Sequence, residues 1–313
     1  MLLQAVAAHG FANLLGFGWL AAYVSLSGSP VATVSLGLLG GGALAAVEAL
    51  GMINGSRLGA SFIVLATGFA YYLRGGTRGR GVISMGILSM LTTATIYIPA
   101  MPLAVALLQA GWLDPVRFGS AAWTTSALDA AVGPVLRLIP PGIPTLMRFG
   151  AGYALLLVSF RLFDRALPRV DTGRLRHGHW GAWLAQPATM FALGLLVTSL
   201  TLSVSVSLSI LVPLAARGIV GRTTVIPYIM GANITTFADT LFAALLIATP
   251  AAFTVVLAEM LAVTAVSLVV LLTMFGAYQR ALLAANSAVA ATKTRFALFV
   301  GALALAPLIL LVL

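Results

Sequence analysis

One stretch of this chain occurs twice, and this repetition restricts the fold more than any other feature. Leu26–Ser61 (LSGSPVATVSLGLLGGGALAAVEALGMINGSRLGAS) aligns without a gap with Leu202–Phe237 (LSVSVSLSILVPLAARGIVGRTTVIPYIMGANITTF), at a constant offset of 176 residues. Few aligned residues are identical, so the alignment rests on the constant offset and on the similar order of residue types. An alignment of this length predicts two related halves. Its main matches are Leu26 with Leu202, Ser27 with Ser203, Ser29 with Ser205, Gly55 with Gly231, and Arg57 with Asn233.

The composition places both halves in a membrane. Of the 313 residues, 61% are hydrophobic and only 8% are charged, which is too few charges to cover a soluble protein of this size. The net charge is +10, but 16 of the 17 basic residues are Arg scattered through short connections. This distribution indicates membrane topology rather than a nucleic-acid partner. We therefore expect an all-α, multi-pass protein of the cell inner (plasma) membrane, in contact with lipid.

The first predicted repeat covers residues 1–168. Its re-entrant helical hairpin, 10–46, has limbs 10–26 and 31–46, each shorter than the ~20 residues needed to cross a membrane. Three spans follow, at 50–73, 82–111 and 145–163. We expect the first span to be broken near Asn54-Gly55-Ser56 and the second to be kinked at Pro99 and Pro102.

The second predicted repeat covers residues 169–313, with a hairpin at 186–216 and spans at 224–248, 251–275 and 296–313. The span 224–248 is expected to be broken within GANITTFADT. Three full crossings separate the two hairpins, so the hairpins should enter from opposite faces. Arg-rich loops, including 165–180, are assigned to the cytoplasm, which puts both termini outside. The sequence thus predicts an inverted-topology repeat.

The hairpin tips are the first candidate site. Ser29 precedes Pro30, an arrangement typical of a helix N-cap followed by the first helical residue. Two such helix ends facing each other would offer free amides and hydroxyl groups to an anion. The predicted substrate-binding residues are Ser27, Ser29, Ser203, Ser205 and Arg57. Alternatively, the serines bond back to their own helices, and Arg57 fills a cation site or pairs with Glu48.

The broken element of the second repeat is the second candidate site. Oxygen ligands beside unwound backbone carbonyls suit a small cation such as sodium. Asp239 is the strongest single candidate, because a carboxylate within an apolar span is costly and usually functional. Its alternative role is that of a proton-bearing or hydrogen-bonded structural acid. The predicted sodium ligands are Asn233, Thr235, Thr236, Asp239 and Ser207.

These motifs resemble those of the sodium/phosphate symporter family, whose members carry a QSSS motif and a GANIGTT-like motif in each inverted half. The second pair is similar to TSLTLSVSVSLSILVPLAARGIV and VIPYIMGANITTFADTLFAALL, and the first, more loosely, to SLSGSPVATVSLGLLGGG and MINGSRLGASF. This chain departs from both family motifs. In the QSSS motif, the glutamine is replaced by Leu26 and Leu202, and one serine is replaced by Gly28 or Val204. In the GANIGTT-like motif, the Asn of the first copy is replaced by Arg57 and the Gly of the second copy by Thr235. The resemblance implies sodium-coupled uptake of phosphate, with phosphate at the hairpin tips and Na⁺ near both motifs.

The expected function is therefore secondary active transport of phosphate or a similar small oxyanion by alternating access. No motif of a soluble enzyme is present, so we expect no enzymatic activity. Two alternatives stay open: a transporter of the same fold with another substrate or with proton coupling, and a membrane scaffold that does not transport. A homodimer is one arrangement compatible with the sequence.

Overall fold

The computed structural model describes residues 10–73, 79–113, 186–204, 206–208, 211, 220–247 and 249–313, together with single positions between 144 and 162. In these ranges the chain is helical and contains no strand. In chain order the elements are α2 (Phe11–Ser25), α3 (Ser29–Gly40), α4 (Ala46–Leu73), α5 (Gly79–Gln109), α9 (Pro187–Thr201), α11 (Arg222–Thr235), α12 (Phe237–Ile247), α13 (Pro250–Val269), the π-helix η2 (Val270–Met274), α14 (Phe275–Ala290) and α15 (Lys293–Val312).

Within the described ranges, five helical stretches are long and apolar enough to cross a membrane. They are Ala46–Ala66, Ile83–Gln109, Arg222–Ile247, Pro250–Ala290 and Lys293–Val312. The chain is therefore a helical membrane protein, as its composition predicts. Five of the six predicted spans coincide with these stretches, whereas the sixth, 145–163, is described only at separate positions and is not among them.

A turn of unusual backbone conformation joins α2 to α3. Leu26 ends α2 with a left-handed conformation (φ 53°, ψ 30°), and α3 then begins at Ser29 with Pro30 in its first turn. The N-cap of α3 is Gly28 and makes no side-chain capping bond. The prediction that Ser29 caps this helix is therefore wrong by one residue, because Ser29 is already helical. The two short helices do occupy the predicted hairpin segment.

The helix α4 follows without the predicted break. It is continuous over its 28 residues, and Glu48 stabilises its first turn by accepting a hydrogen bond from the backbone N–H of Ala45 (2.7 Å). Gly55, which suggested a break, instead allows α2 to come close: a Cβ at this position would overlap the carbonyl oxygen of Leu15. The helix α5 also continues through Pro99 and Pro102.

The two predicted repeats, here called the first unit (residues 1–168) and the second unit (residues 169–313), share several structural features at the offset of 176 residues. The bounds of α9 equal those of α2 shifted by 176, and α11 begins at the position equivalent to the start of α4. Leu202, equivalent to Leu26, has φ 47°, and these two are the non-glycine residues with positive φ in the described chain. Gly231, equivalent to Gly55, approaches the carbonyl oxygen of Phe191, which is itself equivalent to Leu15. The units therefore share backbone geometry as well as sequence.

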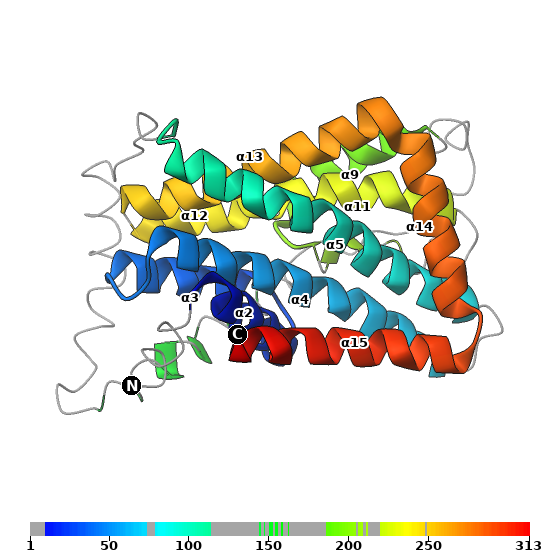
Figure 1. Cartoon of the computed structure of the whole chain (residues 1–313), viewed down its shortest axis with the longest axis horizontal. Helices are drawn as coiled ribbons and strands as arrows, with labels where there is room; N and C mark the ends of the chain where they lie inside the picture. The colour runs from blue at the N-terminus through cyan, green and yellow to red at the C-terminus, as the bar shows by residue number, and fades with distance from the viewer. Residues whose placement is uncertain are drawn as a thin grey trace.

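The end of the chain contains a helix that the sequence analysis missed. The π-helix η2 follows α13, and α14 then runs across the end of the bundle before α15 returns along it (Figure 1). A π-helical turn disrupts the regular i→i−4 bonding and accompanies such a change of direction. Polar residues recur along α14, where Gln279 donates to Thr223 O (2.8 Å) and Asn286 to Ser84 Oγ (2.5 Å). The predicted span 251–275 thus ends at the start of α14.

The long helices lie side by side, and their directions alternate. Figure 1 shows α4 and α13 running toward the end of the bundle crossed by α14, whereas α5, α11, α12 and α15 run away from it. The apolar core lies between α4, α5, α11 and α13, and includes Leu50, Ile53, Leu88, Ile226 and Val256. Lys293 and Arg295 begin α15 at the α14 end, in agreement with a cytoplasmic assignment of that end.

Candidate site: a buried ion pair and an unpaired glutamate

Three charged side chains are buried in the described part of the chain, and they define the candidate site. Arg57 in α4 is 4% exposed, Asp239 in α12 is 8% exposed and Glu259 in α13 is completely buried. A charge at membrane depth is costly and is retained mainly where it pairs or binds something. The site therefore contains one cation and two carboxyl groups, contributed by three helices.

Arg57 extends from the first unit to the second. Its Nη2 lies 3.6 Å from Asp239 Oδ1, and its Nη1 donates a hydrogen bond to Thr236 Oγ1 (3.2 Å). Nη2 also donates to Thr240 Oγ1. The Cζ atom lies 5.0 Å from the centroid of the Phe237 ring, a favourable cation–π arrangement. The partner of Arg57 is therefore Asp239 and not Glu48, which stabilises the first turn of its own helix.

The position of Asp239 follows from an interruption between α11 and α12. Asp239 lies in the first turn of α12, where the positive helix end favours a carboxylate, and its Oδ1 also accepts a hydrogen bond from Thr240 Oγ1 (2.8 Å). The interruption at Thr236 lies within GANITTFADT, where a break was predicted. The backbone there is not unwound, because Thr236 keeps right-handed helical angles (φ −61°, ψ −20°) and its N–H bonds to Ala232 O (3.0 Å). The loose carbonyls expected around a sodium ion are thus absent at this turn.

The predicted sodium ligands separate into groups. Thr236 and Asp239 meet around Arg57, as described above. One turn earlier, Asn233 Nδ2 donates to Thr93 Oγ1 (3.2 Å) and Asn233 O accepts from Tyr97 OH (3.0 Å), which ties α11 to α5. Thr235 Oγ1 bonds to the carbonyl oxygen of Gly231 in its own helix (3.4 Å).

Ser207 belongs to a different polar group. Its Oγ accepts a hydrogen bond from Thr198 Oγ1 (2.7 Å) and shares another with Tyr228 OH (2.8 Å). These contacts join the second limb of this hairpin to its first limb, α9, and to α11. The Ser207 hydroxyl group is therefore used within the protein, and the structure does not bring it to Asp239.

The hairpin serines lie at the turns, as predicted. A Cβ at Gly28 would meet Ser56 O, so the first turn packs against α4 one residue before Arg57. Ser27 O accepts a hydrogen bond from Ser25 Oγ (2.7 Å), and Ser29 is buried. In the second hairpin, Ser203 Oγ accepts from the backbone N–H of Val206 (3.4 Å). This last bond is the local capping role of the alternative prediction, and Ser205 lies outside the described residues.

Glu259 was not identified from the sequence. Neither of its carboxyl oxygens has a hydrogen-bond partner of good geometry in the described part of the chain, and Asn54 Oδ1 is also without one. The Asn54 side chain and the Arg57 guanidinium both interact with this carboxyl group. The sequence did contain the signal, because Glu259 is an isolated acid in the apolar span 251–275. The argument that selected Asp239 applies equally to it.

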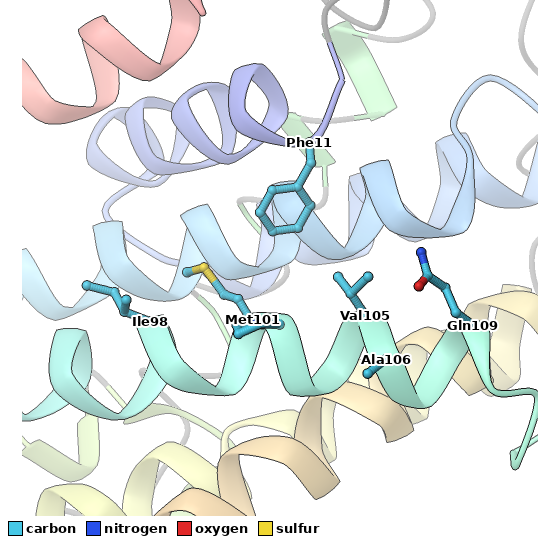
Figure 2. Close-up of a pocket in the computed structure, with 7 residues that line it drawn as sticks. Phe11, Ile98, Met101, Val105, Ala106 and Gln109 are labelled. Carbon is cyan, nitrogen blue, oxygen red and sulfur yellow. The ribbon is translucent and has the colours of Figure 1, made fainter.

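A surface groove lies away from these charges. It has a volume of about 450 Å³ and is lined by Phe11 of α2 and by one face of α5, where Gln109 is the only polar residue (Figure 2). The groove therefore offers no charged group to an ion. In the described ranges there is also no cluster of three His, Cys, Asp or Glu residues that could hold a metal ion.

Comparisons with known proteins add no relative. No family model, no curated protein and no solved structure matches this chain. The resemblance to sodium/phosphate symporters therefore stays a prediction from the sequence motifs, and the interpretation of the site depends on its own geometry.

Proposed function

We propose that this chain is a secondary transporter that moves a small inorganic oxyanion, with phosphate as the first substrate to test, together with a coupling cation across the cell inner membrane. The observation that carries the proposal is the buried pair between Arg57 and Asp239, with 3.6 Å between Nη2 and Oδ1. Each repeat contributes one charge to this pair. An ion pair of this kind, made between two halves at the centre of a membrane protein, is typical of a transport site.

The pair provides a mechanism for coupling. An oxyanion entering from the nearby turn of the first hairpin would compete with Asp239 for the Arg57 guanidinium, which binds carboxylates and phosphates in the same geometry. Asp239 would then be released as an unpaired buried carboxylate, which is unfavourable until a cation binds to it. Anion and cation would therefore bind together, and the site would return to the present pair when both are released.

The repeat geometry supports an inverted architecture, on which many secondary transporters base alternating access. The shared helix bounds, the two left-handed leucines and the two close glycine contacts relate the units at a single offset. The two units also begin their long helices at opposite ends of the bundle, since α4 and α11 run in opposite directions (Figure 1). Related units that point in opposite directions are the arrangement on which alternating access is based.

Cysteine labelling tests this architecture directly, because the chain contains no cysteine. Ala45 and Gly221 are equivalent positions, both exposed, and each precedes its long helix. Ala45→Cys should react with a membrane-impermeant maleimide from outside intact cells. Gly221→Cys should react only after the membrane is opened. If both cysteines are labelled from the same face, the inverted repeat is wrong.

The function is tested by uptake of radiolabelled phosphate into proteoliposomes, with and without an inward sodium gradient. We expect uptake that exceeds that of protein-free liposomes and increases with the gradient. Excess sulfate in a parallel assay shows whether another oxyanion competes. Absence of gradient-driven uptake of phosphate and sulfate would reject oxyanion transport, and uptake driven only by a pH gradient would reject the sodium assignment.

Two variants separate the cation from the anion. Asp239→Asn should raise the sodium concentration for half-maximal uptake much more than the phosphate concentration. Arg57→Lys, which keeps the charge but loses the bidentate geometry, should mainly weaken phosphate binding. Glu48→Gln is the matched control, because Glu48 lies near the start of α4 and away from the pair. Equal effects of the two site variants on both ions would contradict the exchange mechanism.

A further inference from the structure

The mechanism above does not use the group that is buried most completely. Glu259 is fully buried and lacks hydrogen-bond partners at both carboxyl oxygens, and Asn54, also fully buried, lacks one at Oδ1. One N–H of the Asn54 amide donates to Leu50 O (3.1 Å), and the second is left for the neighbouring Glu259 carboxyl group. One remaining N–H thus serves three acceptor atoms on two neighbouring side chains. Buried acceptors without donors are costly, so this site requires something that supplies a donor or a positive charge.

The number of available ligands distinguishes a proton from a metal cation. Cations bound by oxygen atoms in proteins take about six or more ligands, as calcium and magnesium do. The side-chain oxygens available here are two from Glu259 and one from Asn54. A single proton on Glu259, by contrast, turns the carboxyl group into a donor for Asn54 Oδ1. It also removes the charge that makes burial of a carboxylate unfavourable.

The charged groups around Glu259 are compatible with one bound proton. The helix α13 packs against α3, α4, α5, α11, α12 and η2. Arg57 of α4 and Tyr97 of α5 lie within electrostatic range of Glu259, without a direct hydrogen bond or ion pair to it in the described chain. The ionisable residues of α11 are Arg222 at its first position and Tyr228, which bonds to Ser207, and neither α3 nor η2 contains a charged residue. Since Arg57 is paired with Asp239, it does not balance a second carboxylate.

We propose that Glu259 and Asn54 form a proton-binding site, in which Glu259 binds one proton and donates it in a hydrogen bond to Asn54 Oδ1. Use of this proton in coupling depends on the proposed transport function, whereas its binding does not. The site is separate from the Arg57–Asp239 pair, so one transport cycle can involve both.

Infrared spectroscopy of the purified protein at neutral pH tests proton binding without any transport assay. A protonated carboxyl group gives a carbonyl band apart from the amide bands. This band should be present in the wild-type protein, absent in Glu259→Gln and unchanged in the control Glu48→Gln. Asn54→Leu should keep the band but shift its frequency, because the hydrogen-bond acceptor is lost. If Glu259→Gln removes a carboxylate band instead, Glu259 is ionised and the proposal is wrong.

The transport arm uses the same variants in proteoliposomes with a pH-sensitive dye inside. Proton movement coupled to uptake should be lost in Glu259→Gln and kept in Glu48→Gln. Unchanged proton movement in Glu259→Gln would overturn the coupling role. If the wild-type protein transports no oxyanion, the proposed function fails, while the infrared result still decides whether Glu259 binds a proton. Thermal unfolding of Glu259→Gln shows that it folds, since glutamine keeps the shape and neutrality of the protonated acid.

Discussion

The two units differ in the helices that carry Arg57 and its equivalent residue, Asn233. In the first unit α4 is continuous and carries Arg57, whereas in the second α11 and α12 are interrupted at Thr236 and carry Asn233 at the position equivalent to Arg57. The interruption brings Asp239 into the first turn of a new helix, where it meets Arg57. The two copies have therefore become complementary, with a positive charge in one and a negative charge in the other.

A second difference shows what the copies keep. Thr198, Ser207 and Tyr228 form a hydrogen-bonded group in the second unit. Their equivalents at the offset of 176 residues are Ala22, Val31 and Met52, which pack together in an apolar cluster of the first unit. The same three positions are thus occupied by three hydrogen-bonded polar side chains in the second unit and by three apolar side chains in the first. A mixture of the two would leave a buried hydroxyl group unpaired.

The largest effect should follow from breaking the charge complementarity between the units. Asp239→Ala leaves Arg57 buried and unpaired, and should reduce the free energy of unfolding by about 3–5 kcal/mol. The double variant Arg57→Met/Asp239→Leu should recover most of this loss, because apolar residues replace both charges. Thermal unfolding in detergent measures both. A loss that persists in the double variant would show that the pair is not the reason for the cost.

The close packing that the units share is tested at equivalent glycines. Gly55→Ala and Gly231→Ala each place a Cβ against a backbone carbonyl oxygen of the neighbouring helix, and each should cost about 1–3 kcal/mol or more. Gly301→Ala is the matched control, since its added methyl group meets no atom within 4 Å. Thermal unfolding of the three variants decides the point. A large loss of stability at only one of the two positions would show that the two units do not pack equivalently there.

The polar group of the second unit gives a test of intermediate size. Ser207→Val introduces the equivalent residue of the first unit and removes the hydroxyl group to which Thr198 and Tyr228 bond, at a cost of about 1–3 kcal/mol. The triple variant Thr198→Ala/Ser207→Val/Tyr228→Met copies the whole apolar group and should be close to wild type in thermal unfolding. Should the triple variant be the less stable one, the two groups are not interchangeable. Loss of sodium dependence in Ser207→Val with unchanged stability would restore Ser207 as a sodium ligand.

The smallest effect concerns the two left-handed leucines. Leu26→Gly and Leu202→Gly remove the strain of a left-handed conformation, which costs a residue with a side chain about 1–2 kcal/mol. Part of this gain is offset by the greater freedom of glycine in the unfolded chain, so a stabilisation of about 1 kcal/mol or less is expected. Leu26→Ala and Leu202→Ala, which keep the strain, are the controls. A gain at one turn only would show that the two turns differ in solution.

Sequence patterns predicted the parts of the fold that depend on hydropathy. The short limbs, the turns at Leu26 and Leu202 and the five described spans follow from apolar lengths and the repeat. Gly55 was misinterpreted, because a glycine that breaks a helix and one that admits a neighbouring helix look the same in a sequence. The helix α14 was missed because η2 changes direction within a continuous apolar run, 251–275.

The candidate site was predicted less completely than the fold. Arg57, Thr236 and Asp239 were each selected individually, but their direct contact depends on how α4 packs against α12, and periodicity does not contain that information. Ser207 was assigned as a cation ligand, whereas its hydrogen bonds go to Thr198 and Tyr228. Glu259 was overlooked although its burial was predictable from sequence.

The glycine contacts described above also limit how this protein can move. Each interlocks a helix of one hairpin with the following long helix, at Gly18 and Gly55 in the first unit and at Gly194 and Gly231 in the second. Side chains can change rotamer to let helices slide, but a backbone carbonyl lodged against a glycine has no such freedom. The helix pairs α2–α4 and α9–α11 should therefore each move as one rigid body. Relative movement of the two rigid bodies is then confined to the interface between them, where Arg57 contacts Asp239.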